Sequence, residues 1–150
     1  MPLDDDFHIL LIEDSPTDVL IIRRALAEVQ VPHRLTVIAD GTEALDYLAR
    51  LGQPEGNPEP HLILLDLNLP GLDGAEVLGR IKSEPTLRAL PVVVLTTSNR
   101  DEDIWQTYQA GANTYIQKPA DYASYRQLVG TLRTYWHQTA LRPNRPRPMG

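Results

Sequence analysis

The chain has 150 residues, 42% of them hydrophobic, which is enough apolar material for one globular domain with its own core. It contains no cysteine, which excludes disulfides and thiolate metal sites, and its four histidines lack metal-ligand spacing. The net charge of −6 argues against nucleic acid as a partner, because phosphate backbones are bound by basic surfaces. No apolar run reaches the length of a membrane span and the acidic start is no secretion signal, so we expect a cytoplasmic protein.

Five short apolar runs predict β-strands, and in chain order they lie at 8–12, 35–38, 62–65, 92–95 and 113–117. Each run is followed by apolar residues at helical spacing, which predicts helices at 16–29, 41–51, 75–83, 101–110 and 121–136. Alternation of strands and helices is typical of a parallel sheet with helices on both faces. The sequence therefore predicts an α/β fold.

Capping and turn residues mark the ends of several of these elements. Ser15 or Asp14, just before a proline, is a start signal for the first helix. The stretch 52–60 is rich in glycine, proline and polar residues and predicts a surface loop. Ser98 or Asn99 is expected to cap the fourth helix.

The chain shows no internal repeat and no second domain, so we expect one domain over residues 1–136. The remaining stretch, 137–150, contains three prolines and is expected to be a flexible tail.

Chemically distinctive side chains follow the predicted strands: Glu13, Asp14, Asp66, Thr96 and Lys118. Parallel strands all end at one edge of the sheet, so these residues are expected to meet there. Three neighbouring carboxylates repel one another, and a Mg²⁺ ion relieves that repulsion while binding phosphoryl oxygens. With the ammonium of Lys118 and the hydroxyl of Thr96, the set suits an aspartate that attacks phosphorus and holds an acyl phosphate.

These motifs resemble the receiver domain of two-component response regulators. The matching segments are the pair Glu13-Asp14, LLDLNLPGLDG with Asp66, VVVLTTS with Thr96, and YIQKP with Lys118 and Pro119. The resemblance extends from about residue 9 to 132 and keeps the family's order of elements. It implies the (βα)5 receiver fold, a flavodoxin-like, doubly wound sheet of five parallel strands.

By this resemblance, Asp66 is the phosphoacceptor of the chain. Asp14, Asp66 and the backbone carbonyl of Asn68 would bind Mg²⁺, and Glu13 would act through a water molecule. Glu13 stands where the family more commonly has aspartate, and its longer side chain can still hold that water.

The resemblance also implies a switch. Thr96 and Lys118 would bind the phosphoryl group, and Tyr115 would change rotamer when Thr96 moves. The peptide bond before Pro119 would be cis, as is common in the family.

The long loop at 52–60 and the residues of the motifs LLDLNLP and VVVLTTS resemble those of single-domain regulators paired with bacterial phytochromes, those of cyanobacteria in particular. This implies a sensor histidine kinase as donor, a phytochrome by expectation. It also implies a homodimer formed by the fourth helix, fifth strand and fifth helix, with no nucleic acid or membrane among the partners.

Three other functions fit parts of the sequence. Phosphatases of the haloacid dehalogenase type use a similar aspartate but need a second one two residues later, where this chain has Asn68. A flavin-binding module would need a glycine- and hydroxyl-rich loop after the first strand, and the loop here is acidic. A degenerate receiver, which binds partners without taking phosphate, stays open as the alternative. We expect no classical enzyme activity.

Overall fold

Strands and helices alternate throughout the part of the chain that the computed structural model describes, residues 7–29 and 33–143. The elements are β1 (Phe7–Ile12), α1 (Pro16–Glu28), β2 (His33–Ile38), α2 (Gly41–Ala49), β3 (Leu62–Leu65), α3 (Gly74–Ser83), β4 (Val92–Thr96), α4 (Asp101–Gln109), β5 (Thr114–Gln117), α5 (Tyr122–Arg133) and the π-helical turn η2 (Thr134–Thr139). None of the helices in these residues combines the length and the apolar character that crossing a bilayer requires.

The five strands form one parallel sheet in the order β2-β1-β3-β4-β5. Ile12 pairs with Leu65, and Leu65 pairs with Val94, so the three central strands end at nearly the same level. The order reverses between β1 and β3, and ligands of doubly wound sheets bind outside the carboxyl ends of strands at such a point. This topology confirms the predicted flavodoxin-like (βα)5 fold.

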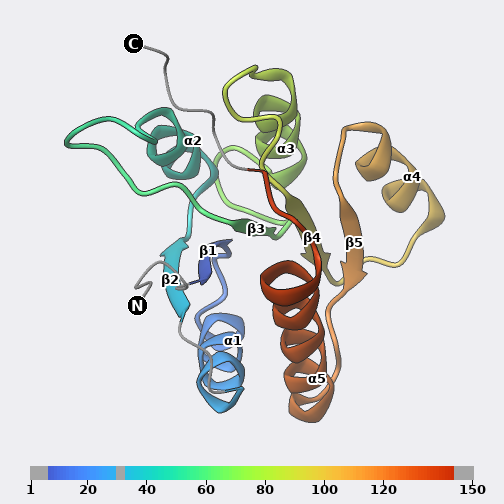
Figure 1. Ribbon diagram of the computed structural model, residues 1–150. Coiled ribbons are helices and arrows are strands. Elements are labelled where there is room, and N and C mark those ends of the chain that lie inside the picture. Colours follow the sequence, from blue (N-terminus) through green and yellow to red (C-terminus); the bar gives the residue numbers. More distant parts are fainter. Residues whose placement is uncertain (1–6, 30–32, 144–150) are drawn as a thin grey trace, which may run out of the picture.

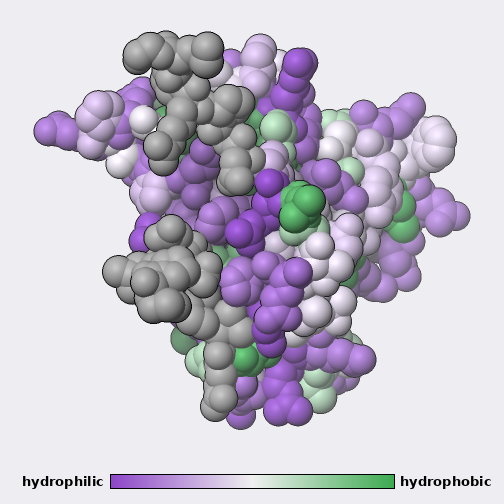
Figure 2. Space-filling model, in the orientation of Figure 1, coloured by the Kyte–Doolittle hydropathy of each residue, from purple (hydrophilic) through white to green (hydrophobic). Residues whose placement is uncertain are grey.

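Helices cover both faces of the sheet, with α2 and α3 on one side and α1 and α5 on the other (Figure 1). Alternate residues of β1 belong to the hydrophobic cores on opposite faces of the sheet. Leu10 and Ile12 pack toward α2 and α3, while Ile9 and Leu11 pack toward α1 and α5. The outer surface in the same view is mostly hydrophilic, with scattered hydrophobic residues (Figure 2). Burial on both faces explains why β1, β3 and β4 are continuous apolar runs.

The start of α4 differs from the prediction. Arg100 occupies the N-cap position and makes no side-chain capping bond, so capping by Ser98 or Asn99 was wrong. Ser98 Oγ instead accepts a hydrogen bond from the Arg100 N–H and donates one to Asp103 Oδ2. The physical reason is position: Ser98 lies two residues before the N-cap and reaches an acidic side chain of the first turn.

The C-terminal segment returns to the beginning of β1. The Arg142 guanidinium lies 5.5 Å from the centroid of the Phe7 ring, and its Nη1 donates a 3.1 Å hydrogen bond to the Trp136 carbonyl. Of the tail predicted at 137–150, residues 137–139 belong to η2 and Arg142 contacts Phe7, while residues 144–150 lie outside the described residues.

Removing a buried side chain from β1 should test this two-sided core. Leu10 is fully buried and Leu20, on α1, is 67% exposed. We expect Leu10→Ala to lower the free energy of unfolding by about 2–5 kcal/mol, because it leaves a cavity. Leu20→Ala should change it by about 0.5 kcal/mol or less. Urea unfolding followed by circular dichroism measures both, and equal losses would contradict the assigned packing.

Candidate functional site

Asp66 follows β3 directly and is held in place by its backbone. Its N–H donates a 3.0 Å hydrogen bond to the Ile12 carbonyl, which ties it to the end of β1. Its Oδ1 accepts a 3.1 Å bond from the Asn68 N–H, and the residue is 5% exposed. One carboxylate oxygen is thus fixed by the following turn, while the other faces the residues described next.

The loop after Asp66 closes tightly on the strand end through Gly74. The Gly74 N–H donates a 3.0 Å hydrogen bond to the Leu67 carbonyl. A Cβ at Gly74 would collide with the carbonyl oxygen of Asp66, so any larger residue would displace the backbone that carries this carboxylate. Only glycine permits this close approach.

Three carboxylates meet at this edge, from Glu13, Asp14 and Asp66. One oxygen from each lies within 4.8 Å of the others. Glu13 is buried, and its Oε2 accepts a 3.2 Å hydrogen bond from the Ser15 N–H, whereas Asp14 is exposed. Carboxylates at this spacing repel one another, and hard divalent cations prefer such oxygen ligands. The donor set therefore fits Mg²⁺ or Mn²⁺.

Lys118, which follows β5, supplies the positive charge of the site. Its Nζ lies 2.8 Å from Asp18 Oδ2, 2.9 Å from Glu13 Oε1 and 3.4 Å from Asp66 Oδ2. Its backbone N–H donates a 2.7 Å hydrogen bond to the Thr96 carbonyl, which fixes the backbone at Lys118 to the end of β4. Asp18 is a member of this group that the sequence did not indicate, since an acidic residue in the first turn of a helix is usually explained by the helix dipole.

The charges of the site perturb its own titration. Burial raises the pKa of Glu13 from an ordinary value of 4.5 to about 7; the neighbouring Asp66 acts in the same direction and the bond from Lys118 opposes it. Burial lowers the pKa of Lys118, but the bonds and charges of Asp18, Glu13 and Asp66 outweigh it, so this pKa is raised. Lys118 stays charged, whereas ionising the Glu13 carboxyl is costly, mainly because it is buried and secondly because Asp66 lies beside it.

Thr96 ends β4 beside this group, and the residue is 1% exposed. Its Oγ1 is buried and has no hydrogen-bond partner among the described residues. Buried hydroxyls are nearly always bonded, so an unpaired one at a strand end indicates a place where a ligand oxygen binds.

Tyr115 is half-buried on β5, and its hydroxyl donates a 3.0 Å hydrogen bond to the Ser98 carbonyl in the loop between β4 and α4. Its N–H donates to the Tyr108 hydroxyl of α4 at 3.1 Å. The ring therefore connects β5 to the segment that follows Thr96.

The peptide bond before Pro119 is trans, as no described peptide bond is cis, so the expected cis proline was wrong. The physical reason is that an X–Pro bond favours trans by about 0.5–1 kcal/mol unless the surrounding fold imposes the other isomer.

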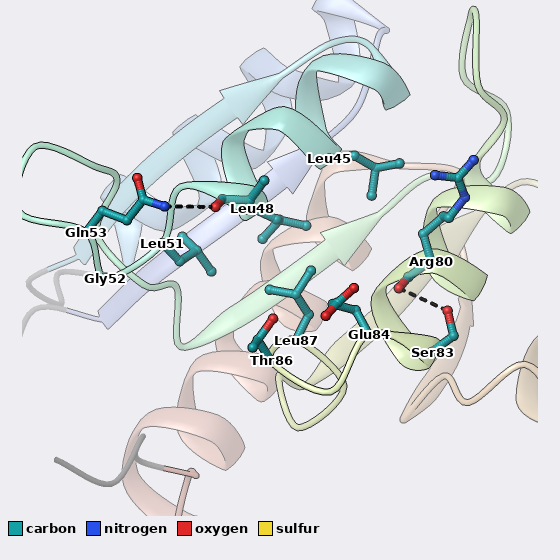
Figure 3. A pocket seen from close by; sticks show the side chains of 11 residues that line it. Leu45, Leu48, Leu51, Gly52, Gln53, Arg80, Ser83, Glu84, Thr86 and Leu87 are labelled. Atoms are coloured by element: carbon teal, nitrogen blue, oxygen red, sulfur yellow. Dashed lines mark hydrogen bonds between the residues drawn. The ribbon is translucent and has the colours of Figure 1, made fainter. Parts of the chain in front are cut away.

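A cavity of about 630 Å³ lies elsewhere, between α2 and α3 (Figure 3). Leu45, Leu48 and Leu51 project into it opposite Leu87. Its polar lining residues are all exposed, and no member of the acidic group lines it. The cavity is therefore separate from the group at the strand ends, where Glu13, Asp66 and Thr96 are buried.

Comparisons with known proteins show the family of the chain. The chain matches the response regulator receiver domain over residues 9–130. It is 39% identical to response regulator Rcp1 of Synechocystis over 135 residues, which cover 90% of this chain and 92% of Rcp1. The crystal structure of the phosphorylated cyanobacterial phytochrome response regulator RcpA superposes with a TM-score of 0.86 at 44% identity, covering 93% of this chain and 99% of RcpA. The crystal structure of the Mn²⁺-bound form of Rcp1 superposes with a TM-score of 0.83 at 39% identity, covering 91% of this chain and 99% of Rcp1.

Glu13→Gln should reveal the cost of ionising a buried carboxyl beside Asp66. A group whose pKa is raised by folding contributes stability that is complete below its unfolded pKa, here 4.5, and lost as the pH rises through about 7. With EDTA present, we expect E13Q to be more stable than the parent protein above pH 7, by about 1–3 kcal/mol. The difference should vanish below pH 4.5.

Thermal unfolding across this pH range measures the effect. Glu43→Gln is the matched control, because Glu43 is exposed in the first turn of α2. A parent protein that is as stable as E13Q above pH 7 would contradict the raised pKa of the buried Glu13.

Proposed function

Because the chain belongs to the response regulator receiver family, we propose that it accepts a phosphoryl group on Asp66 in two-component signalling and thereby switches its contacts with other proteins. The observation that carries this proposal is the meeting of Asp66 with two further carboxylates and the ammonium of Lys118 at one sheet edge. A carboxylate in such a setting is a nucleophile whose target is phosphorus.

The transfer is a displacement at phosphorus. An oxygen of Asp66 forms a bond to phosphorus as the bond to the donor histidine nitrogen breaks, and the electron pair stays on the imidazole. Water later attacks the acyl phosphate, releases inorganic phosphate and restores the carboxylate. Lys118 and the unpaired Thr96 hydroxyl bind the phosphoryl oxygens.

Glu13, Asp14 and Asp66, together with the Asn68 carbonyl, would hold a divalent cation, which we propose to be Mg²⁺. When bound, the cation neutralises charge on the carboxylates and the transferred group. Receiver structures similar to this chain contain Mn²⁺ in Rcp1 and Mg²⁺ in the receiver domain of the sensor histidine kinase PA1611.

Phosphorylation would reach the surface through Thr96 and Tyr115. A phosphoryl group adds roughly one further negative charge and three acceptor oxygens, which draw the Thr96 hydroxyl toward Asp66. Tyr115 can follow only if it gives up its hydrogen bond to the Ser98 carbonyl. Because Ser98 lies in the loop that leads into α4, losing this bond also affects α4. Couplings of this kind are typically worth about 1–3 kcal/mol, enough to shift a binding equilibrium.

The proposed donor is a sensor histidine kinase, and specifically a phytochrome. Support comes from relatives: RcpA is a phytochrome response regulator, and RPA3017 of R. palustris, a regulator in red light signaling, is 34% identical with a TM-score of 0.84. Such a partner implies a cytoplasmic protein that acts as a stoichiometric acceptor rather than an enzyme, since Asn68 cannot serve as a general acid. The receiver would span residues 1–136, followed by the tail 137–150.

We further propose a homodimer formed through α4, β5 and α5. Trp105 is 67% exposed and Tyr108 is 46% exposed, and both lie on α4. Tyr108 also contacts the backbone of Tyr115, so a rearrangement of β5 changes this aromatic surface. Exposed aromatic residues are enriched in interface cores.

Asp66→Asn should abolish acid-labile phosphate uptake, because an amide is no nucleophile toward phosphorus. The measurement is transfer of radiolabelled phosphate from a panel of histidine kinases, with a phytochrome among them. The parent protein should be labelled fastest by the phytochrome.

Asp14→Asn is a second variant, which should reduce labelling by weakening cation binding while leaving some uptake. Label retained in D66N would move the acceptor elsewhere. Absence of any label in the parent protein, with every donor, would favour the degenerate receiver.

Trp105→Ala should weaken dimerisation of the phosphorylated or beryllofluoride-bound protein by about tenfold, the effect of losing about 1.4 kcal/mol of contact energy. Tyr135→Ala is the control, because Tyr135 is 51% exposed on η2, outside the proposed face. Sedimentation velocity over a concentration series measures both. A dimer disrupted only by the Tyr135 change would place the interface on η2.

A further inference from the structure

The shortest contacts of Lys118 are not with the proposed phosphoacceptor. Its Nζ lies closest to Asp18 Oδ2, at 2.8 Å, and farther from Asp66 Oδ2, at 3.4 Å. A lysine ammonium has three donors, and Asp18, Glu13 and Asp66 take one each. Lys118 is thus shared between the centre of the site and a residue outside the acidic group that fits the cation.

Asp18 is held in position independently of Lys118. It lies in the first turn of α1, where its N–H donates a 3.2 Å hydrogen bond to the Ser15 side chain, and Pro16 restricts the same turn. The Asp18 side chain can therefore hold the ammonium toward α1, away from Asp66.

The three carboxylates differ in the cost of losing the ammonium. The side chain of Glu13 is 1% exposed and that of Asp66 is 6% exposed, whereas that of Asp18 is 23% exposed. A buried carboxylate left without a partner is strongly destabilised, but one in contact with water can be hydrated instead. Of the three bonds, the one to Asp18 is the cheapest to break.

We propose that Asp18 is a positioning residue that competes with the phosphoryl group for Lys118. The inference rests on the proposed phosphoacceptor function. Without phosphate, Asp18 draws the ammonium to the rim of the site. When Asp66 carries a phosphoryl group, Lys118 leaves Asp18 for a phosphoryl oxygen, keeps its bond to Glu13, and Asp18 is hydrated. Asp18 therefore sets how readily the site holds a phosphoryl group.

The test measures the affinity of the full chain for beryllofluoride at saturating Mg²⁺, by isothermal titration calorimetry. Asp18→Asn keeps the shape and removes the competing charge. We expect it to bind about three- to tenfold more tightly than the parent protein, because a charge-assisted bond no longer opposes the movement of Lys118. Asp18→Ala provides a second variant with the same expected direction, and circular dichroism verifies that each is folded.

A double-mutant cycle separates positioning of Lys118 from a general effect of charge. In a Lys118→Ala background, Asp18→Asn should change the affinity by about twofold or less, because no ammonium remains to be released. Glu43→Gln removes the same charge from the first turn of another helix and should leave the affinity unchanged.

Tighter binding that depends on Lys118 supports the proposal. Unchanged or weaker binding in D18N overturns it, and so does an equal gain in both backgrounds, which would assign the effect to the electrostatic field alone. If the parent protein itself binds no beryllofluoride, the phosphoacceptor function fails, and the role of Asp18 fails with it.

Discussion

Three carboxylates, those of Glu13, Asp18 and Asp66, share one ammonium at the carboxyl edge of the sheet, and a fourth, that of Asp14, lies beside Glu13 and Asp66. This imbalance of charge is the constraint on which the rest of the structure depends. It arises from the fold, because the parallel strands β1, β3 and β5 deliver Glu13, Asp66 and Lys118 to the same edge. The fold keeps Glu13 and Asp66 in place because the strands behind them, β1 and β3, are buried on both faces. An edge with excess negative charge is prepared for cations and for chemistry at phosphorus.

The same packing determines which residues can move in response to a change at Asp66. The residues of β1, β3 and β4 are buried throughout, and close-packed interiors do not deform gradually. Movement is left to side chains at the edge that have alternative partners. Lys118 can exchange one carboxylate for another, and Thr96 has an unpaired hydroxyl. The Tyr115 hydroxyl makes one hydrogen bond, to the loop between β4 and α4. A rigid core with adjustable residues around its rim is a suitable construction for a switch.

The fold was largely readable from the sequence, because strands buried on both faces are unbroken apolar runs, and 62–65 was assigned to the residue. Strand-end residues were readable too, since parallel topology places them by rule. Contacts between residues far apart in the sequence could not be predicted in this way. Asp18 and Lys118 are 100 residues apart, and only the packing of α1 beside the sheet edge brings them together. The π-helical turn η2 after α5 and the trans peptide bond before Pro119 depend on small local energy differences. Patterns of residue types in the sequence do not reveal such differences.

The contact between Arg142 and Phe7 brings the two ends of the described chain together at the amino edge of the sheet. A strand of six residues separates this point from Glu13, roughly 20 Å at the usual rise per residue. The first and last parts of the described chain therefore lie near each other and clear of the strand-end carboxylates. The same closeness makes the chain a natural candidate for circular permutation, with new ends opened in the exposed turn around Gly52.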